Sequence, residues 1–426
     1  MRARLSLFLA GTLGLAACQG DAPPSSPAAA APSTVQENFL TYVPQAPLDA
    51  AQRGRLEIIR GRAGSDEVSL ARVAKAPTRL LQRGAAIRMA IAPGVQVVAV
   101  GESVQERAAD DISWGGPVMG SEGWVQMVYA DGGVTATLTI GRTQYSIEPL
   151  GNGLHAVAKI DQNALPSEHP AENPSGTPLS DAINQATDEF LAARGGDGEG
   201  TVGIAANTTV NVMVVYTASA ASAAGNISSK IQLAVDETNQ SYVNSGVNIT
   251  MNRVHTAQVT YSETGKSFST HVNNLKGTTD GQMDNVHSLR NTYAADVVVL
   301  VVNDSEACGI AAAIKATATS AFAVAHYTCI TGYYSFAHEV GHLQGARHDR
   351  YVDPTNTPYQ YGHGFIPASK SWRTIMAYGN NCSNCTRIQY WSNPLKTYGG
   401  VAMGTATYED NARVLNATAA TVAAFR

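Results

Sequence analysis

The segment "FAHEVGHLQGARHD" (residues 336–349) constrains the fold more than any other part of the chain, because it predicts a helix with a fixed end. Its apolar residues recur at helical spacing and predict one buried stripe. Side chains four positions apart project from the same face of a helix, so His338 and His342 should lie together. Gly345 permits the left-handed turn that ends many helices, and the chain can then bring His348 to the same point. The segment therefore predicts three imidazoles that converge on one ion.

Three imidazoles leave one position of a tetrahedral site open, which is typical of a catalytic zinc ion and not of a structural one. Glu339 is next to the first histidine, close enough to act as a general base toward water without being a ligand. A chance cluster of surface histidines is the alternative, but at ordinary residue frequencies this spacing should occur in roughly one of 10⁵ chains. We therefore predict one catalytic Zn²⁺ held by His338, His342 and His348, with Glu339 as the base.

Composition and charge place the chain among soluble exported proteins. Of its 426 residues, 44% are hydrophobic and 15% are charged. The net charge of −5 and the lack of a basic stripe argue against nucleic-acid binding. Residues 1–18, "MRARLSLFLAGTLGLAAC", combine two arginines with an apolar run that is too short to span a bilayer. This pattern predicts an export signal.

The signal ends in a sequence that resembles a bacterial lipoprotein box, in which Cys18 is lipidated and holds the protein at a membrane surface. Ordinary signal-peptidase cleavage nearby is the alternative. The other four cysteines are expected to form two disulfides in an exported chain. They are Cys308, Cys329, Cys382 and Cys385. Of the three possible pairings we favour Cys308–Cys329 with Cys382–Cys385. A four-cysteine zinc site is the rival, which the oxidising compartment and the spacing disfavour.

Four regions are expected along the chain. Residues 1–18 form the signal, and the Pro/Ala/Ser-rich residues 19–40 form an unstructured tether. In residues 41–199 hydrophobicity alternates between Gly-rich turns, and Asp131–Gly132 is a hairpin signal, so a β-rich domain with a flexible end is predicted. Residues 200–426 alternate strand and helix patterns around the apolar run "DVVVLVVN", which predicts an α/β domain with a twisted mixed sheet.

Helices are predicted near residues 181–193, 228–242 and 281–293. The stretch "CGIAAAI" (308–314) is predicted as a short strand. Carboxylates and Asn residues are scattered through the second half, but no calcium-loop spacing emerges, so the sequence leaves calcium binding open.

The zinc motif followed by Asp349 resembles that of the metzincin metallopeptidases, which also carry a methionine-containing turn beneath the metal. "WRTIMAYG" supplies such a turn, with Met376 in it. Tyr378 follows two positions later. In the astacin and serralysin branches a tyrosine at that place stabilises the oxyanion, whereas Asp349 resembles the reprolysin branch, which lacks the tyrosine. The resemblance implies a metzincin fold and leaves Tyr378 either catalytic or structural.

Further stretches resemble the bacterial peptidyl-Asp metalloendopeptidases. They are "YYSFAHEVGHLQGARHD", "YGHGF", "WRTIMAY", "YWSNP" and "NARVLNATAATVAAF". Members of that family cleave polypeptides on the amino side of aspartate, so the resemblance implies a cation in the pocket beyond the scissile bond. Arg387 and Arg373 are the candidates for this cation, and Lys370 and Lys396 are weaker options.

In the metzincin order, "CGIAAAI" is at the place of the edge strand, against which an extended substrate can pair. Its small residues, such as Gly309 beside Ile310, allow a substrate backbone to lie close; an ordinary short strand is the alternative. We therefore expect a secreted, monomeric zinc endopeptidase that prefers aspartate. A metzincin of broad specificity is one alternative. A non-catalytic surface lipoprotein with a vestigial zinc site is another, and retention of Glu339 disfavours it.

The β-rich domain is expected to be a propeptide that keeps the enzyme inactive. Residues 19–307 contain no cysteine, so a thiolate cannot block the zinc, and the block must be a carboxylate, a histidine or simple occlusion. Asp161, Glu168 and His169 are the candidates, and the sequence does not rank them. Gly196–Asp197 offers a bond before aspartate that the enzyme could cut itself, which would separate the catalytic domain from its anchor.

Overall fold

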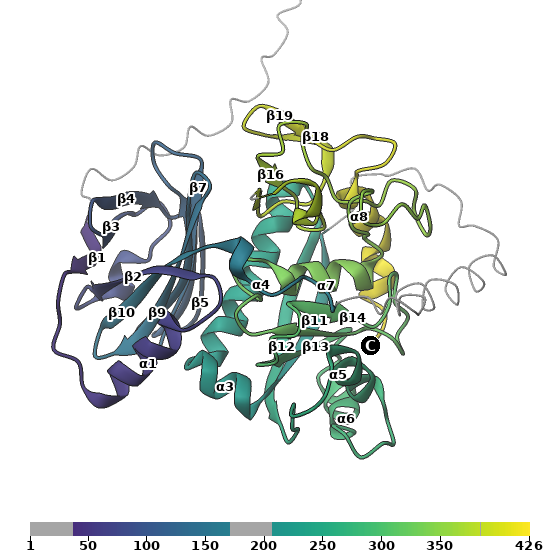
Figure 1. Cartoon of the computed structure of the whole chain (residues 1–426), viewed down its shortest axis with the longest axis horizontal. Helices are drawn as coiled ribbons and strands as arrows, with labels where there is room; N and C mark the ends of the chain where they lie inside the picture. The colour runs from purple at the N-terminus through teal and green to yellow at the C-terminus, as the bar shows by residue number, and fades with distance from the viewer. Residues whose placement is uncertain (1–36, 171–206, 384) are drawn as a thin grey trace, which may run out of the picture.

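A computed structural model describes residues 37–170, 207–383 and 385–426. These residues form a β-rich part and a mixed α/β part, which lie side by side with helix α4 (Ile227–Ser245) along the seam between them (Figure 1). The expectations for Cys18, for the helix at 181–193 and for Gly196–Asp197 lie outside the described residues. No helix in the described ranges is long and apolar enough to cross a membrane.

The β-rich part is one ten-stranded sheet in the order β4-β3-β1-β2-β10-β9-β8-β7-β6-β5. Its neighbouring strands pair antiparallel, except that β1 and β3 pair parallel. The strands are β1 (Glu37–Val43), β2 (Ser65–Val73), β3 (Ala86–Ala92), β4 (Val95–Val100), β5 (Ser103–Ala108), β6 (Asp111–Pro117), β7 (Gly123–Ala130), β8 (Gly133–Ile140), β9 (Thr143–Gly151) and β10 (Leu154–Ile160). The β-rich region predicted from alternation is therefore present.

Two local predictions in this sheet have different outcomes. The hairpin at Asp131–Gly132 is confirmed: both residues have positive φ, 53° and 73°, and they join β7 to β8. The tether was predicted to reach residue 40, but β1 already begins at Glu37. Helix α1 (Ala50–Arg60) was not predicted; it starts at the capping box of Asp49 and buries Leu56 against the sheet.

The α/β part is built on a five-stranded sheet in the order β12-β11-β13-β15-β14. Its strands are β11 (Thr208–Thr217), β12 (Ile249–Val259), β13 (Val297–Val302), β14 (Gly309–Ala311) and β15 (Phe322–His326). All of them pair parallel except β14, which pairs antiparallel with β15 at one edge. Every residue of β13 is buried, as expected for a central strand covered on both faces.

Helices cover both faces of this sheet. The helices are α3 (Ala218–Ala224), α4, α5 (Phe268–Lys276), α6 (Asn285–Thr292), α7 (Ser335–Gln344) and α8 (Asn411–Val422). Alternate residues of β13 point to opposite cores: Val299 packs in the core that contains α4, α7 and α8, and Leu300 packs in the core that contains α5 and α6. Two small ribbons, β16 (Trp372–Arg373) with β17 (Thr386–Arg387) and β18 (Asn393–Tyr398) with β19 (Val401–Met403), follow the helix α7 in sequence.

Several boundaries differ from the sequence patterns. Helix α4 matches the predicted helix at 228–242, but α6 starts only at Asn285, and α5 was missed. The strand predicted for residues 308–314 is reduced to Gly309–Ala311, because the chain leaves the sheet edge after three residues. The edge position itself is confirmed by the strand order.

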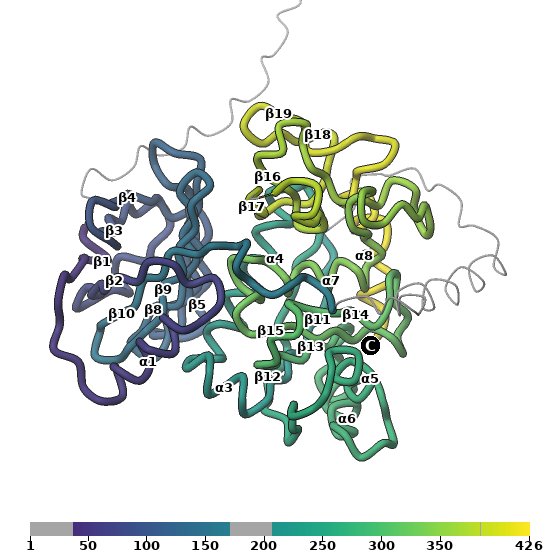
Figure 2. Tube along the Cα trace, viewed as in Figure 1, coloured from purple at the N-terminus to yellow at the C-terminus, as the bar shows by residue number. Residues whose placement is uncertain are grey.

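The seam between the two parts is charged and polar. Glu148 of β9 forms ion pairs with three cations: Arg55 of α1, Arg62 just after α1, and Lys230 of α4. All four side chains are largely buried. The guanidinium of Arg62 and the amine of Lys230 hold the pKa of this carboxyl well below its usual range, although burial acts to raise it. Beyond the short helix η2 (Gln162–Ala164), the chain leaves the sheet and enters the α/β part, as the trace shows (Figure 2).

Candidate functional site

The predicted helix and its end are both present. Helix α7 spans Ser335–Gln344, and all ten of its residues are buried. It ends at Gly345, whose φ of 106° lies in the left-handed region, as its position after the motif predicts. The next turn of chain returns toward the helix and places His348 beside His342.

The three imidazoles converge at one point. The Nε2 atoms of His338, His342 and His348 are 2.9, 3.1 and 3.2 Å from one another. The Nδ1 atom of His338 lies 2.9 Å from the carbonyl of Ile375, and that of His342 lies 2.9 Å from the carbonyl of Ala346. Because a carbonyl can only accept, these two rings carry their proton on Nδ1 and direct Nε2 lone pairs inward. Lone pairs that face each other in a buried site require a cation between them.

The spacing of these atoms fits zinc. Ligand nitrogens at about 2.0–2.1 Å from a tetrahedral Zn²⁺ lie about 3.3 Å from one another, close to the observed distances. Burial holds the pKa of His338, His342 and His348 well below its usual range, so the rings are neutral and can offer their lone pairs. The three residues therefore suit a metal ion without rearrangement.

Glu339 is fully buried beside this centre. Neither of its carboxylate oxygens has a hydrogen-bond partner among the described residues, and Oε1 lies 3.4 Å from Nε2 of His169. Burial raises the pKa of Glu339 to about 7, whereas the neighbouring His169 acts to lower it. A buried carboxylate that accepts no hydrogen bond is costly unless it has a function, and this one lies beside the histidine centre with the His169 imidazole as its neighbour.

The edge strand β14 passes directly over Glu339. A methyl group placed on Gly309 would lie 2.3 Å from Oε1 and 2.7 Å from Cδ of Glu339, so only glycine fits this position. Ile310, the other residue predicted for substrate binding on this strand, is half-buried and packs into the core with α5 and α6. Gly309 is thus next to the candidate base, whereas Ile310 holds the strand to the sheet.

Met376 lies beneath the helix, in a tight turn that a hydrogen bond from Ala377 N to Thr374 O closes at 3.0 Å. It is fully buried, and its Sδ atom would lie 3.1 Å from a methyl group on Gly341 of α7. The same turn supplies the Ile375 carbonyl that fixes the His338 ring. The turn therefore supports the helix at the level of the histidines.

Tyr378 and Asp349 connect this turn to the third histidine. The ring of Tyr378 lies 4.3 Å from that of His348, and its buried hydroxyl has no partner within the described part of the chain. The carboxylate of Asp349 accepts the backbone N–H of Tyr378 at 2.8 Å. His363 donates from Nδ1 to the carbonyl of His348 at 2.8 Å, so it supports the ligand and is not one itself.

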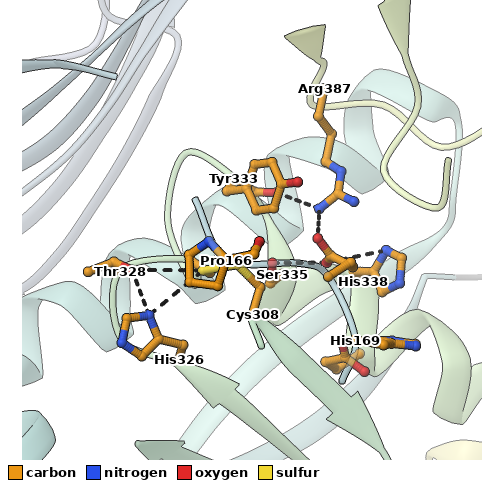
Figure 3. The surroundings of a disulfide bond; sticks show 12 residues. Pro166, His169, Cys308, His326, Thr328, Tyr333, Ser335, His338 and Arg387 are labelled. Atoms are coloured by element: carbon orange, nitrogen blue, oxygen red, sulfur yellow. Dashed lines mark hydrogen bonds and ion pairs between the residues drawn. A yellow bond between two sulfur atoms is a disulfide. The ribbon is translucent and has the colours of Figure 1, made fainter. Parts of the chain in front are cut away.

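A buried carboxylate-binding group, here called the carboxylate pocket, lies next to His338; Figure 3 labels its Arg387, Tyr333 and Ser335. Arg387 points into it from β17 and binds Oε2 of Glu168 through Nη1 at 2.8 Å. Ser335 donates its hydroxyl to Oε1 of the same carboxylate at 2.9 Å. The carbonyl of Tyr333 accepts from Arg387 at 3.0 Å, and the guanidinium stacks over the Tyr333 ring at 4.3 Å. Arg387 and Glu168 are both almost completely buried.

The structure separates the two arginines predicted to bind substrate. Arg373 and Arg387 are register partners on β16 and β17, but Arg373 points to protein acceptors: the carbonyls of Ala377 and Cys385 and, at 3.1 Å, the hydroxyl of Tyr333. Arg373 therefore supports Tyr333 from behind, which argues against the prediction that it contacts substrate. Arg387 keeps Nε and Nη2 without hydrogen-bond partners in the described ranges.

Both favoured disulfides are present. Cys308–Cys329 joins the start of the edge strand to the segment before α7, and Cys382–Cys385 closes a small loop before β17. Tyr333 and Ser335, which shape the carboxylate pocket, were not predicted. The only sequence signal for them is their position just before the zinc motif in "YYSFAHE".

The fold and the site define a metallopeptidase. The model of Metallo-peptidase family M12 matches residues 206–392, which contain the whole histidine centre. That family implies a zinc ion, and the His-rich site is there to hold it. The protein is therefore a zinc metalloendopeptidase with polypeptide substrates.

Curated relatives narrow the class. A peptidyl-Asp metalloendopeptidase of Xanthomonas campestris pv. campestris is 46% identical over 295 residues, 69% of this chain and 67% of that protein. One from Stenotrophomonas maltophilia (strain K279a) is 44% identical over 69% of this chain and 68% of its own length. One from Pseudomonas fragi is 42% identical over 45% of this chain and 100% of its own length. The chain belongs to the peptidyl-Asp metalloendopeptidase family.

Proposed function

We propose that the protein cleaves peptide bonds on the amino side of aspartate, with Arg387 as the residue that recognises the aspartate side chain. The contact between Arg387 and the Glu168 carboxylate carries this proposal. It identifies a buried guanidinium next to the histidine centre that binds a carboxylate supplied by another segment of chain. An arginine fork suits this role because its donors are rigid and match the geometry of a carboxylate. The names of the curated relatives support the same preference.

The roles of the remaining groups follow from their positions. When bound by His338, His342 and His348, Zn²⁺ supplies a Lewis acid for water and for the scissile carbonyl. Glu339, whose buried carboxylate lies next to this centre and accepts no hydrogen bond, takes the proton from the attacking water and passes it to the leaving amine. The unpartnered hydroxyl of Tyr378 donates a hydrogen bond to the negative charge that develops on the carbonyl oxygen.

Substrate backbone pairs with the edge strand β14 once the Ser167–Glu168 segment, which accepts the Cys308 and Gly309 amides in the intact chain, has left it. Gly309 lets the substrate approach Glu339 because it has no side chain. Met376 acts as the Met-turn residue, packed under α7 where it limits movement of the ligand-bearing helix. These assignments make residues 200–426 the peptidase domain.

We also propose the precursor organisation that the sequence suggests. Residues 1–18 act as a lipoprotein-type signal, 19–40 as a tether and 41–199 as a propeptide, so that the mature enzyme is secreted after release. N-terminal sequencing of the soluble enzyme tests this organisation. A start between Asp197 and Thr208 supports it, and a start at Gln19 contradicts it.

The preference for aspartate is tested with Arg387→Met, which removes the guanidinium but keeps much of the volume. In a proteome digest the variant should lose the aspartate preference, with kcat/KM for an Asp peptide reduced by about 100-fold or more, the cost of losing a charged hydrogen-bonded pair. Lys370→Met is the matched control, since Lys370 is an exposed cation of the same region. An undiminished preference in Arg387→Met would contradict the proposal.

A further inference from the structure

We propose that Glu168 and His169 form a two-part internal ligand of the active site. In the precursor, the carboxylate of Glu168 fills the Arg387 pocket and the imidazole of His169 is the fourth protein ligand of the metal. This inference rests on the proposed function for its Glu168 half, whereas its His169 half depends only on the histidine centre.

His169 lies close to the three motif histidines. One ligand atom from each of His169, His338, His342 and His348 lies within 4.8 Å of the others. The ring centroid of His169 lies 4.8–5.5 Å from those of the other three. Its Nε2 atom is buried and has no hydrogen-bond partner in the described part of the chain. Four convergent imidazoles complete a tetrahedral zinc site and leave no open position.

His169 also occupies the space that the candidate base faces. Its Nε2 lies 3.4 Å from Oε1 of Glu339, so water cannot occupy the same place. His169 belongs to the segment that follows η2, which is far from the zinc motif in sequence. A closed metal site without water next to Glu339 is incompatible with hydrolysis.

Glu168 is buried among groups that bind its carboxylate. Its carboxylate is 3% exposed and receives Arg387 at 2.8 Å and the Ser335 hydroxyl at 2.9 Å. An ion pair this deeply buried is maintained only when both charges have good partners, because removal of one leaves an unpaired charge. The precursor thereby satisfies the cation that the substrate aspartate satisfies during turnover.

The edge strand holds the backbone of this segment. The amide of Cys308 donates to the carbonyl of Ser167 at 2.7 Å, and the amide of Gly309 donates to the carbonyl of Glu168 at 2.9 Å. Both carbonyls are thus directed at the edge strand and not toward the histidines. The segment occupies the strand edge, the carboxylate pocket and the metal position together, and its Ser167 and Glu168 carbonyls are both engaged by the edge strand.

Glu168 and His169 are adjacent residues, so the binding of one side chain strengthens the binding of the other. Once Glu168 is in its pocket, His169 is held at the metal with a high effective concentration, and the reverse also holds. Removal of either anchor should therefore weaken the other and open the site.

The test uses the full-length chain with Glu339→Gln, so that it cannot process itself, loaded with Co²⁺ in place of zinc. The visible absorption of Co²⁺ reports its coordination, and acetohydroxamate probes whether the fourth position is accessible. The reference chain should keep its spectrum when acetohydroxamate is added. His169→Ala should change the spectrum and bind acetohydroxamate at least tenfold more tightly; Glu168→Gln should show a smaller increase in the same direction. Ser167→Ala is the matched control, since this side chain is exposed and only its carbonyl makes a contact.

A second variant covers the case in which His169→Ala loses its cobalt or its fold. In His169→Gly, added imidazole should restore the reference spectrum by occupying the vacated position. The metal half is overturned when His169→Ala and the reference share both spectrum and acetohydroxamate affinity, or when imidazole changes nothing in His169→Gly. If Glu168→Gln binds acetohydroxamate with the same affinity as the reference chain, the carboxylate half alone is overturned. Loss of aspartate preference is measured on the mature enzyme through Arg387, so the two proposals can fail separately.

Discussion

At the scale of single residues, the tightest constraint in the site is the missing side chain of Gly309. The edge strand and Glu339 approach each other so closely that even a methyl group would overlap the carboxylate. With substrate paired to β14 as proposed, the contact brings its backbone within reach of Glu339. It also means that a very small change can displace the base.

Gly309→Ala is therefore expected to reduce kcat/KM by 100-fold or more, because a misplaced base costs about this much even when the metal is retained. Peptide hydrolysis and zinc content per chain check this. Ala311→Gly, on the same strand, is the control and should stay within a few-fold of the wild type. Full activity in Gly309→Ala would show that Glu339 and β14 do not approach in the active enzyme.

Glu339→Gln removes the base but keeps the size of the side chain. We expect kcat to fall by about 10²–10⁴-fold, the usual contribution of a general base, with zinc still bound at one ion per chain. Elemental analysis and steady-state kinetics on the same sample distinguish this result from metal loss. An active Glu339→Gln enzyme would exclude Glu339 as the base.

At the scale of elements, the helix α7 and the Met376 turn are fitted to each other through Gly341. A methyl group there would lie 2.6 Å from the Trp391 ring and 3.1 Å from Met376 Sδ. Gly341 immediately precedes His342 on this helix, so the packing around Gly341 sets the position of the ligand side chains.

Gly341→Ala is expected to destabilise the protein by about 1–3 kcal/mol, which is typical of overpacking in a filled core. Urea unfolding of the zinc-bound protein measures this. In a double-mutant cycle, Gly341→Ala should cost less in a Trp391→Leu background than in the wild type, since the smaller side chain makes room for the methyl group. If the single variant is as stable as the wild type, α7 is not held against the turn in this way.

The two disulfides should contribute unequally. Cys308 and Cys329 are 21 residues apart, whereas Cys382 and Cys385 are 3 apart. The chain-entropy model gives about 3 kcal/mol for the first loop and about 2 kcal/mol for the second. Urea unfolding of the two Cys→Ser double variants compares them, and equal losses would contradict this ranking.

How much the sequence predicts differs between these elements. The three zinc ligands follow from spacing alone, because helix geometry and one glycine determine where His338, His342 and His348 lie. The Asp131–Gly132 hairpin is local in the same sense. The carboxylate pocket is not: Arg387, Ser335 and Glu168 are brought together by packing between segments far apart in the chain. The sequence offers both Arg387 and Arg373 as candidates for the cation that binds aspartate, and only their side-chain directions in the structure distinguish them.

At the scale of the whole molecule, the seam along α4 contains a carboxyl with an altered pKa. Glu237 accepts the Gly332 amide at 2.9 Å, and burial raises the pKa of Glu237 to about 8. Thr137 of β8 bonds to the same side chain, and the charged groups that face it are Lys230, which lowers its pKa, and Asp236, which raises it. The carboxyl is therefore protonated at neutral pH while the two parts are together.

A raised pKa of this kind stabilises the folded precursor fully below the pKa of the unfolded chain and loses that contribution as the pH rises through about 8. The free energy of unfolding in urea should thus fall between pH 5 and pH 8, by at most about 1.4 kcal/mol per pH unit for one group. Glu237→Gln, which stays neutral, should flatten this slope. The same slope in both proteins would exclude Glu237 as its source.

The polar make-up of α4 has a consequence for the fate of the two halves. Its side toward the β-rich sheet carries Lys230, Gln232, Asp236 and Glu237, residues that are covered in the intact chain. If the β-rich part is removed, this polar surface is readily hydrated. The released enzyme then has no large apolar patch at this helix face through which copies could aggregate. A seam of this composition is suited to being opened once and left open.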